Sequence, residues 1–168
     1  LVRDGFDLAV RIGKVPDSGL KLKRAGEVIL VLVASPDYLK EHEKIKEPRD
    51  LQRHSCLSLN LQQNYDRWTL KCESKSVTVG VQPKILSNQM SSLIRVALNH
   101  GGIALVPSYL AQPHLEIGQL IRVLPDWSCL GFPVSIISPL SPSSSARLKH
   151  TVDQIFEELK LANIITKG

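Results

Sequence analysis

The residues best placed for chemistry lie at the start of an expected helix, in the segment Ser87 to Met90. A helix start presents free backbone N–H groups and the positive end of the helix dipole, so it can hold an anion. Ser87 or Asn88 can instead cap the helix, because a short polar side chain accepts a hydrogen bond from one of the same N–H groups. The pattern therefore leaves two interpretations open, an anion site and an ordinary helix cap.

The helix expected after this start has its apolar residues at helical spacing. They are Met90, Leu93, Ile94, Ala97 and Leu98. Gly101 and Gly102 are expected to end the helix, since a left-handed residue after a helix costs least at glycine. Ile103 to Val106 is then a short apolar run that Pro107 stops. We therefore predict a helix, a glycine turn and a buried strand in succession.

Catalysis and metal binding find little support in the remaining residues. The five histidines, at positions 42, 54, 100, 114 and 150, are scattered and lie in no hydrolase or metalloprotease frame. We expect His54 and His100 to be structural hydrogen-bonding residues. The three cysteines are widely spaced without a CxxC pair, which predicts reduced thiols in a cytoplasmic protein and no zinc site. We predict no catalytic residue, no metal and no cofactor.

Short strands and helices interchange along the chain, which predicts an α/β fold. Strands are expected at Asp7–Ile12, Leu20–Ala25, Glu27–Ser35, Ser55–Leu61, Trp68–Cys72, Ser76–Val81, Ile103–Val106, Gln119–Leu124 and Phe132–Ser138. Besides the helix after Ser87, helices are expected at Asp37–Glu43, Ser108–Glu116 with an interruption at Pro113, and Ser145–Leu161. Ser35-Pro36 should cap the first of them, and Pro83–Leu86 is expected to be a connection.

Charge and hydropathy limit the partners of this chain. The formal net charge is +5 over 168 residues, but no dense basic block interleaves with aromatic residues. Direct, specific binding of nucleic acid by this chain is therefore not expected. No run of about 18 apolar residues occurs, so we expect no transmembrane helix and no membrane partner.

Five segments, taken in order, carry a resemblance to a known family. They are DGFDLAVRIG (Asp4–Gly13), VLVASPDYL (Val31–Leu39), EPRDLQRHSCL (Glu47–Leu57), NQMSSLIRVALNHGGIALVPSYL (Asn88–Leu110) and GQLIRVLPDW (Gly118–Trp127). Together they resemble the C-terminal effector-binding domain of LysR-type transcriptional regulators. The resemblance implies a two-lobed, type 2 periplasmic-binding-protein-like α/β fold whose first lobe is incomplete here. Residues 1–27 and 133–168 would form the first lobe, and residues 28–132 the second.

The resemblance also implies a small-molecule site between the lobes, where strand ends and helix starts meet. The expected effector-binding residues are Arg11, Ile12 and Gly13 in the first lobe and Ser58, Asn60, Asn88, Gln89, Met90, Gly102 and Ile103 in the second. Arg11 can equally serve in a structural ion pair, and we leave both roles open. The expected effector is a small organic anion, a carboxylate in the first instance.

Three functions remain open. The favoured one is the effector-sensing domain of a LysR-type regulator, a homodimer or tetramer that binds DNA only through an N-terminal winged helix-turn-helix domain absent from this chain. The alternatives are a solute-binding protein of a transport system with the same fold and an enzyme of this architecture. For the fold, we predict two sheets that exchange strands twice, with Leu8–Ile12 and Leu57–Leu61 in different sheets. We further expect Leu8–Ile12 to lack one of its strand neighbours within this chain.

Overall fold

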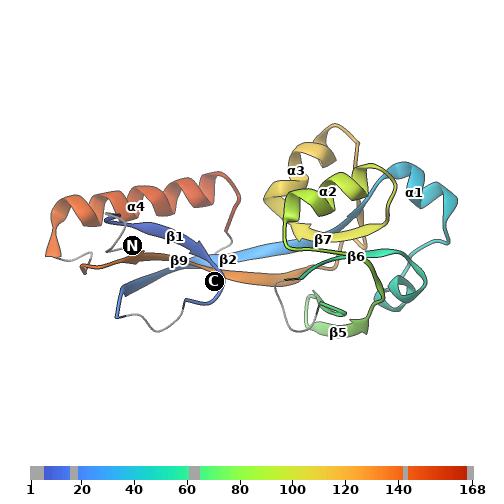
Figure 1. The fold of residues 1–168 in the computed structure, drawn as a ribbon, viewed down its shortest axis with the longest axis horizontal. Helices are drawn as coiled ribbons and strands as arrows, with labels where there is room; N and C mark the ends of the chain where they lie inside the picture. Colours follow the sequence, from blue (N-terminus) through green and yellow to red (C-terminus); the bar gives the residue numbers. More distant parts are fainter. Residues whose placement is uncertain (1–5, 16–18, 61–64, 142–143, 166–168) are drawn as a thin grey trace. The chain divides into compact units, whose positions relative to one another are not determined.

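A computed structural model describes residues 6–15, 19–60, 65–141 and 144–165. Its contacts divide the chain into two units: unit 1 is Leu1–Ile29 with Gly131–Gly168, and unit 2 is Leu30–Leu130. Both boundaries fall inside long strands, β2 (Lys21–Ala34) and β9 (Cys129–Ser138) (Figure 1). The expected lobe boundaries, after residues 27 and 132, lie two residues away, and the lobe assignment itself stays a prediction. Asp4, Gly5 and Leu61, which belonged to expected elements, lie outside the described residues.

Strand β2 is a single strand of 14 residues. The expectation of two strands, ending at Ala25 and resuming at Glu27, is wrong. Gly26 stays within the strand because glycine, lacking a Cβ, adopts its φ of 156° without a clash. The first part of β2 is exposed and charged, whereas Val28 and the residues from Leu30 to Ala34 are buried. The most hydrophobic run of the sequence is therefore a central strand, as expected.

Seven strands from both units form one hydrogen-bonded sheet in the order β1-β9-β2-β7-β3-β6, with β8 paired to β2, whereas the hairpin of residues 67–80 forms a separate two-stranded sheet. The shorter strands are β1 (Ala9–Ile12), β3 (Cys56–Leu59), β6 (Pro83–Ser87), β7 (Ile103–Pro107) and β8 (Ile121–Val123). The prediction that Leu8–Ile12 and Leu57–Leu61 lie in different sheets is therefore wrong, because β1 and β3 belong to the same sheet. Because β2 and β9 each contribute residues to both units, they make the ladder continuous from β1 to β6. Within the described residues β1 pairs with β9 alone and forms the edge of the sheet.

Strand β3 lies between β6 and β7 and runs parallel to both. The carboxyl ends of these three strands therefore point to one edge of the sheet. Leu59 pairs with Ser87 at that edge, and the next N–H, of Asn60, donates to the Ser87 carbonyl at 2.8 Å. Helix α2 (Met90–Leu98) then connects β6 to β7 (Figure 1). Strand β6 was not predicted from the sequence, since Pro83 and its exposed neighbours are typical of a loop as well as an edge strand.

Serine side chains cap two helices, of which only the cap of α1 by Ser35 was predicted. The Ser35 hydroxyl accepts from the Tyr38 N–H at 3.3 Å at the start of α1 (Pro36–Glu41). The Ser145 hydroxyl accepts from the Leu148 N–H at 3.5 Å at the start of α4 (Ala146–Leu161). Helix α3 (Ser108–Glu116) runs through Pro113, so the expected interruption is wrong.

The predicted antiparallel hairpin is confirmed as β4 (Arg67–Cys72) and β5 (Lys75–Gly80). Its buried face is made by alternate residues, among them Trp68, Leu70 and Val79. A short 3-10 helix, η2 (Pro48–Arg53), precedes β3 and ends at His54. Both the hairpin and η2 belong to unit 2, where β5 packs against η2.

The turn between α2 and β7 places residues in unusual backbone conformations. The left-handed position after the helix is taken by His100, with φ 61°, and not by a glycine as expected. Gly102 has φ +143° and approaches the backbone of Ser55 so closely that an added Cβ would lie 2.2 Å from the Ser55 carbonyl oxygen. The Ile103 N–H donates to the same carbonyl at 2.8 Å. The glycine at position 102 therefore allows β7 to pair with the start of β3.

We predict that Gly102→Ala destabilises the protein by about 3 kcal/mol, because the new methyl group meets main chain that cannot rotate away. Gly80→Ala is the control, since a Cβ at Gly80 meets no atom within 4 Å and should change stability by less than about 0.5 kcal/mol. Chemical denaturation followed by circular dichroism measures both. Equal stability of the two variants would contradict the assigned contact.

Candidate functional site

Helix α2 begins without a side-chain cap. Its N-cap residue is Gln89, whose side chain accepts no hydrogen bond from the helix. The Ser87 hydroxyl accepts from the N–H of the N-cap residue Gln89 at 3.1 Å, and not from an N–H of the first turn of α2. The interpretation that Ser87 or Asn88 caps α2 is therefore wrong. The first turn contains no acidic residue. The N–H groups at this start are therefore left for water or a ligand, and the dipole favours a negative charge there.

Helix α3 begins in the same way at the same edge of the sheet. It follows β7 directly, its N-cap residue Pro107 provides no side-chain hydrogen bond, and its first turn has no acidic residue. Strands β6 and β7 flank β3, so their ends are separated by roughly 10 Å. Tyr109 in the first turn of α3 is half-buried, and this burial raises the pKa of its phenol. This second helix start was not predicted from the sequence, although an apolar strand running straight into a helix would have indicated it.

Four predicted site residues lie together at this edge. Asn60 follows β3, Asn88 and Gln89 lie between β6 and α2, and Met90 is the first residue of α2. The hydrogen bond from Asn60 N–H to the Ser87 carbonyl connects the two segments. The side chains of Asn60, Asn88 and Gln89 are exposed, and that of Met90 is half-buried. Amide side chains and open helix N–H groups therefore occupy one surface of unit 2.

Three other predicted residues of unit 2 are placed elsewhere. Ser58 is 1% exposed, and its hydroxyl accepts from the indole N–H of Trp68 at 3.1 Å. Gly102 and Ile103 lie at the amino end of β7, so they are at the opposite edge of the sheet from Asn60. Ile103 is fully buried. The structure gives these three residues packing and pairing contacts.

Arg11, Ile12 and Gly13 lie at the end of β1 in unit 1. Arg11 is opposite Ser135 in the ladder with β9, and its side chain is exposed. Gly13 donates its N–H to the Pro133 carbonyl at 2.8 Å. None of the ion pairs found among the described residues involves Arg11, so the structural ion pair left open for this side chain has no support in that part of the chain.

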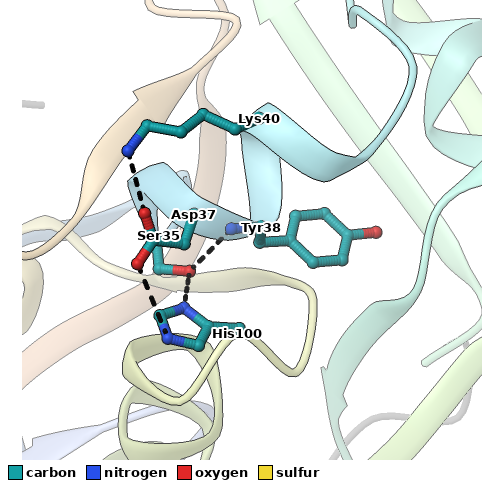
Figure 2. A network of polar contacts seen from close by, with 5 residues as sticks. All are labelled: Ser35, Asp37, Tyr38, Lys40 and His100. Atoms are coloured by element: carbon teal, nitrogen blue, oxygen red, sulfur yellow. Dashed lines mark hydrogen bonds and ion pairs between the residues drawn. The ribbon is translucent and has the colours of Figure 1, made fainter.

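A polar network in unit 2 contains a serine, a histidine and an aspartate (Figure 2). The Ser35 Oγ lies 2.8 Å from Nδ1 of His100, and Nε2 of His100 lies 3.8 Å from a carboxylate oxygen of Asp37. Lys40 donates to the other oxygen of Asp37 at 2.9 Å. The hydrogen bond and charge of Lys40, and more weakly His100, hold the pKa of Asp37 below its ordinary value.

The hydrogen bonding of this network is structural. The Ser35 hydroxyl accepts from the Tyr38 N–H as the cap of α1 and also shares a hydrogen bond with Nδ1 of His100. Ser35 is 1% exposed, so its oxygen has no access to a substrate carbonyl. The network connects the start of α1 to the turn between α2 and β7. The expectation that His100 is a structural hydrogen-bonding residue is confirmed.

Two further findings concern metals and membranes. Within residues 6–15, 19–60, 65–141 and 144–165, no three histidine, cysteine, aspartate or glutamate side chains are close enough to share a metal ion. In the same part of the chain, no helix is long and apolar enough to cross a membrane.

The thiol of Cys56 is held in the core of unit 2. Cys56 is buried and its thiol donates to the Leu51 carbonyl, and burial raises the pKa of this thiol to about 12.

Solved structures identify the class of fold. The regulatory domain of CrgA from Neisseria meningitidis superposes with a TM-score of 0.76 at 24% identity, covering 95% of this chain and 78% of that one. The full-length virulence activator AphB of Vibrio cholerae superposes with a TM-score of 0.73 at 24% identity, covering 89% of this chain and 51% of that one. The chain thus has the type 2 periplasmic-binding-protein-like α/β fold of bacterial regulatory domains.

The family follows from the sequence comparisons. The family model of the LysR substrate binding domain matches residues 1–160. The "Probable HTH-type transcriptional regulator LtrA" of Klebsiella pneumoniae is 33% identical over 126 residues, which are 75% of this chain and 41% of that protein. The HTH-type transcriptional regulator PtxR of Pseudomonas aeruginosa is 28% identical over 159 residues, which are 95% of this chain and 51% of that protein. The chain belongs to the LysR family and is an effector-binding regulatory domain of a LysR-type regulator.

This membership decides among the three functions that the sequence left open. LysR-type regulators are not enzymes, so the expectation of no catalytic activity is confirmed by the family. A LysR effector domain binds a small molecule, as expected from the sequence. The chain spans about half or less of the length of these two relatives.

We predict that the Ser35–His100 hydrogen bond stabilises unit 2 measurably. Ser35→Ala removes both the cap and this bond and should cost about 1–2 kcal/mol. His100→Asn keeps a residue that tolerates positive φ and removes the ring. A double-mutant cycle by chemical denaturation should give a coupling of about 1 kcal/mol between the two positions.

The control in this experiment is Ser35→Ala paired with His114→Asn, since His114 bonds Gln119 on the surface of α3 and does not contact the network. That second cycle should show additive effects. Additivity in both cycles would mean that Ser35 and His100 do not interact energetically.

Proposed function

We propose that this domain senses a small organic anion, held by the open helix starts at the carboxyl edge of β7, β3 and β6. The observation that carries the proposal is the start of α2, which has neither a side-chain cap nor an acidic residue in its first turn. Binding of the anion would then change DNA binding or transcription by the longer regulator. A homodimer or tetramer with a separate N-terminal DNA-binding domain remains our proposal for that protein.

The chemistry of this edge supports an anion over a neutral ligand. Two helices, α2 and α3, direct their N-termini to one edge, and neither brings a carboxylate to that end. A single contact with a helix dipole contributes only about 0.3–1 kcal/mol at an exposed site. Several N–H donors must therefore act together, with the amides of Asn60, Asn88 and Gln89 supplying further hydrogen bonds. Charge-assisted bonds of this kind are about twice as strong as neutral ones.

The described residues at this edge favour a carboxylate without a large aromatic ring. Asn60, Asn88 and Gln89 offer hydrogen bonds and no stacking surface, and Tyr109 is the one aromatic residue in the first turns of the two helices. Arg11 stays a proposed contact of the anion, on the ground of its charge and its exposed side chain. Ser58, Ile12, Gly13, Gly102 and Ile103 were expected as contacts too, and of these Ser58, Gly102 and Ile103 already have structural roles.

The test is calorimetric titration of the chain with a panel of small mono- and dicarboxylates. Gln89→Glu adds a negative charge at the start of α2 without changing the length of the side chain. It should weaken binding of a carboxylate about fivefold, the equivalent of one dipole-favoured contact. Asn88→Ala should weaken it by removal of a hydrogen bond.

Gln82→Glu is the matched control, because Gln82 is exposed and precedes β6 at the opposite edge of the sheet. It makes the same charge change and should leave the affinity as it is. Equal weakening by Gln82→Glu and Gln89→Glu would indicate only a long-range charge effect. A carboxylate that binds unchanged to the Gln89→Glu and Asn88→Ala variants would show that the start of α2 is not the site.

A further inference from the structure

A cluster of three rings joins α1 to the start of β3, away from the proposed anion site. Tyr38 of α1 is 2% exposed, and His54, at the end of η2, is 6% exposed. The Tyr38 hydroxyl lies 3.2 Å from Nδ1 of His54 and accepts from the N–H of Ser55 at 3.0 Å. His42 stacks on the Tyr38 ring with centroids 3.9 Å apart. One phenol oxygen therefore holds η2, β3 and α1 together.

The hydrogen bonds of this cluster are satisfied best when His54 is neutral. The Ser55 N–H can only donate, so the Tyr38 oxygen accepts this bond, and among the described residues Nδ1 of His54 is the one acceptor within reach of the hydrogen of the Tyr38 hydroxyl. Nδ1 of His54 must then be unprotonated, and the ring carries its hydrogen on Nε2. That Nε2 is buried and has no hydrogen-bond partner among the described residues. A second proton on the ring would set N–H against O–H at the Tyr38 contact, so the Tyr38 hydroxyl would have to turn its hydrogen away from its acceptor while the Nε2 N–H stays unsatisfied.

We propose that His54 is an acid-sensitive latch, whose protonation releases the Tyr38 hydroxyl and loosens α1 from the start of β3. The latch acts through hydrogen bonds that exist only with a neutral ring. The start of β3 also carries the Ser55 carbonyl that receives the Ile103 N–H, so the released segment is part of the β3–β7 pairing. The latch controls the stability of this segment and is independent of the anion site.

The charged and titratable groups around His54 come from three elements. The residues of α1 and the turn after it supply Tyr38, His42 and Glu43, η2 supplies Asp50, and β3 supplies the buried thiol of Cys56. Burial first, and then the charge of His42, lower the pKa of His54, whereas Glu43 and Asp50 raise it in part. Burial likewise raises the pKa of Tyr38, so its hydroxyl keeps its hydrogen at neutral pH. The net effect favours the neutral imidazole.

The direction of the pH effect follows from this lowered pKa. The unfolded chain takes up a proton at His54 near the ordinary pKa of 6.5, before the folded chain does. The contribution of His54 to stability is therefore complete above about pH 6.5 and is lost as the pH falls below it toward the lowered pKa. A fall in pH should therefore loosen the contact between α1 and the start of β3 at His54 first.

The experiment is an NMR titration of the chain between pH 7.5 and pH 5, followed by the ring signals of His54 and the exchange of the Ser55 amide. We expect the His54 ring to titrate below about pH 6.5 and the protection factor of Ser55 to fall about tenfold with the same midpoint, the change that corresponds to loss of one hydrogen bond. Titration at or above this pH, or protection of Ser55 that does not follow His54, would overturn the proposal.

Tyr38→Phe separates the latch from a general effect of acid, because it keeps the ring stacked on His42 and removes only the hydroxyl. In this variant the Ser55 amide should be unprotected already at pH 7.5 and should not respond to the titration of His54. Tyr109→Phe, which removes a phenol hydroxyl from α3, should behave as the unchanged protein. If the Tyr38→Phe variant retains the pH-dependent protection of Ser55, the hydroxyl does not transmit the protonation.

Discussion

The parallel pairing of β3 with β6 and β7 is the constraint on which the organisation of unit 2 depends. It sends three carboxyl ends to one edge of the sheet and three amino ends to the other. At the carboxyl edge the chain continues into exposed amides and the open start of α2. At the amino edge, Ser55 receives Ile103 and sits against Gly102 and the Tyr38 hydroxyl. Strand direction thus separates a surface open to ligands from a packed, hydrogen-bonded base.

The elements that the sequence predicted well have signals confined to a few neighbouring residues. The apolar face of α2, the buried strand after it and the serine cap of α1 follow from spacing and local hydrogen bonding. The joining of two expected strands into β2 could not be predicted in this way. Glycine commonly weakens or interrupts a strand, and the local sequence does not show that the strand continues through Gly26. Similarly, His100 takes the left-handed position and its ring bonds Ser35, a residue 65 positions earlier, which no local pattern indicates.

The candidate site was predictable only in part, for a related reason. Asn88, Gln89 and Met90 were found because a helix start is a local feature, and Asn60 was found from alternation along its strand. Gly102 and Ile103 are near these residues in sequence, but α2 returns the chain to the amino edge before β7 begins. Ser58 shares a strand with the site and is nevertheless buried against Trp68 from the hairpin. The local sequence pattern predicts neither the direction of β7 nor the position of the hairpin.

The four α-helices of the described residues differ in whether a side chain caps the N-terminus, and this difference affects how a ligand could bind there. Serine hydroxyls satisfy N–H groups at the starts of α1 and α4, whereas α2 and α3 receive no side-chain bond. An exposed N–H without a protein partner is satisfied by water, so a ligand there exchanges one hydrogen bond for another and gains little per contact. Affinity must then come from charge and from several donors acting together. At the proposed anion site, binding built from several weak contacts would be readily reversible, as a domain that senses a small-molecule effector requires.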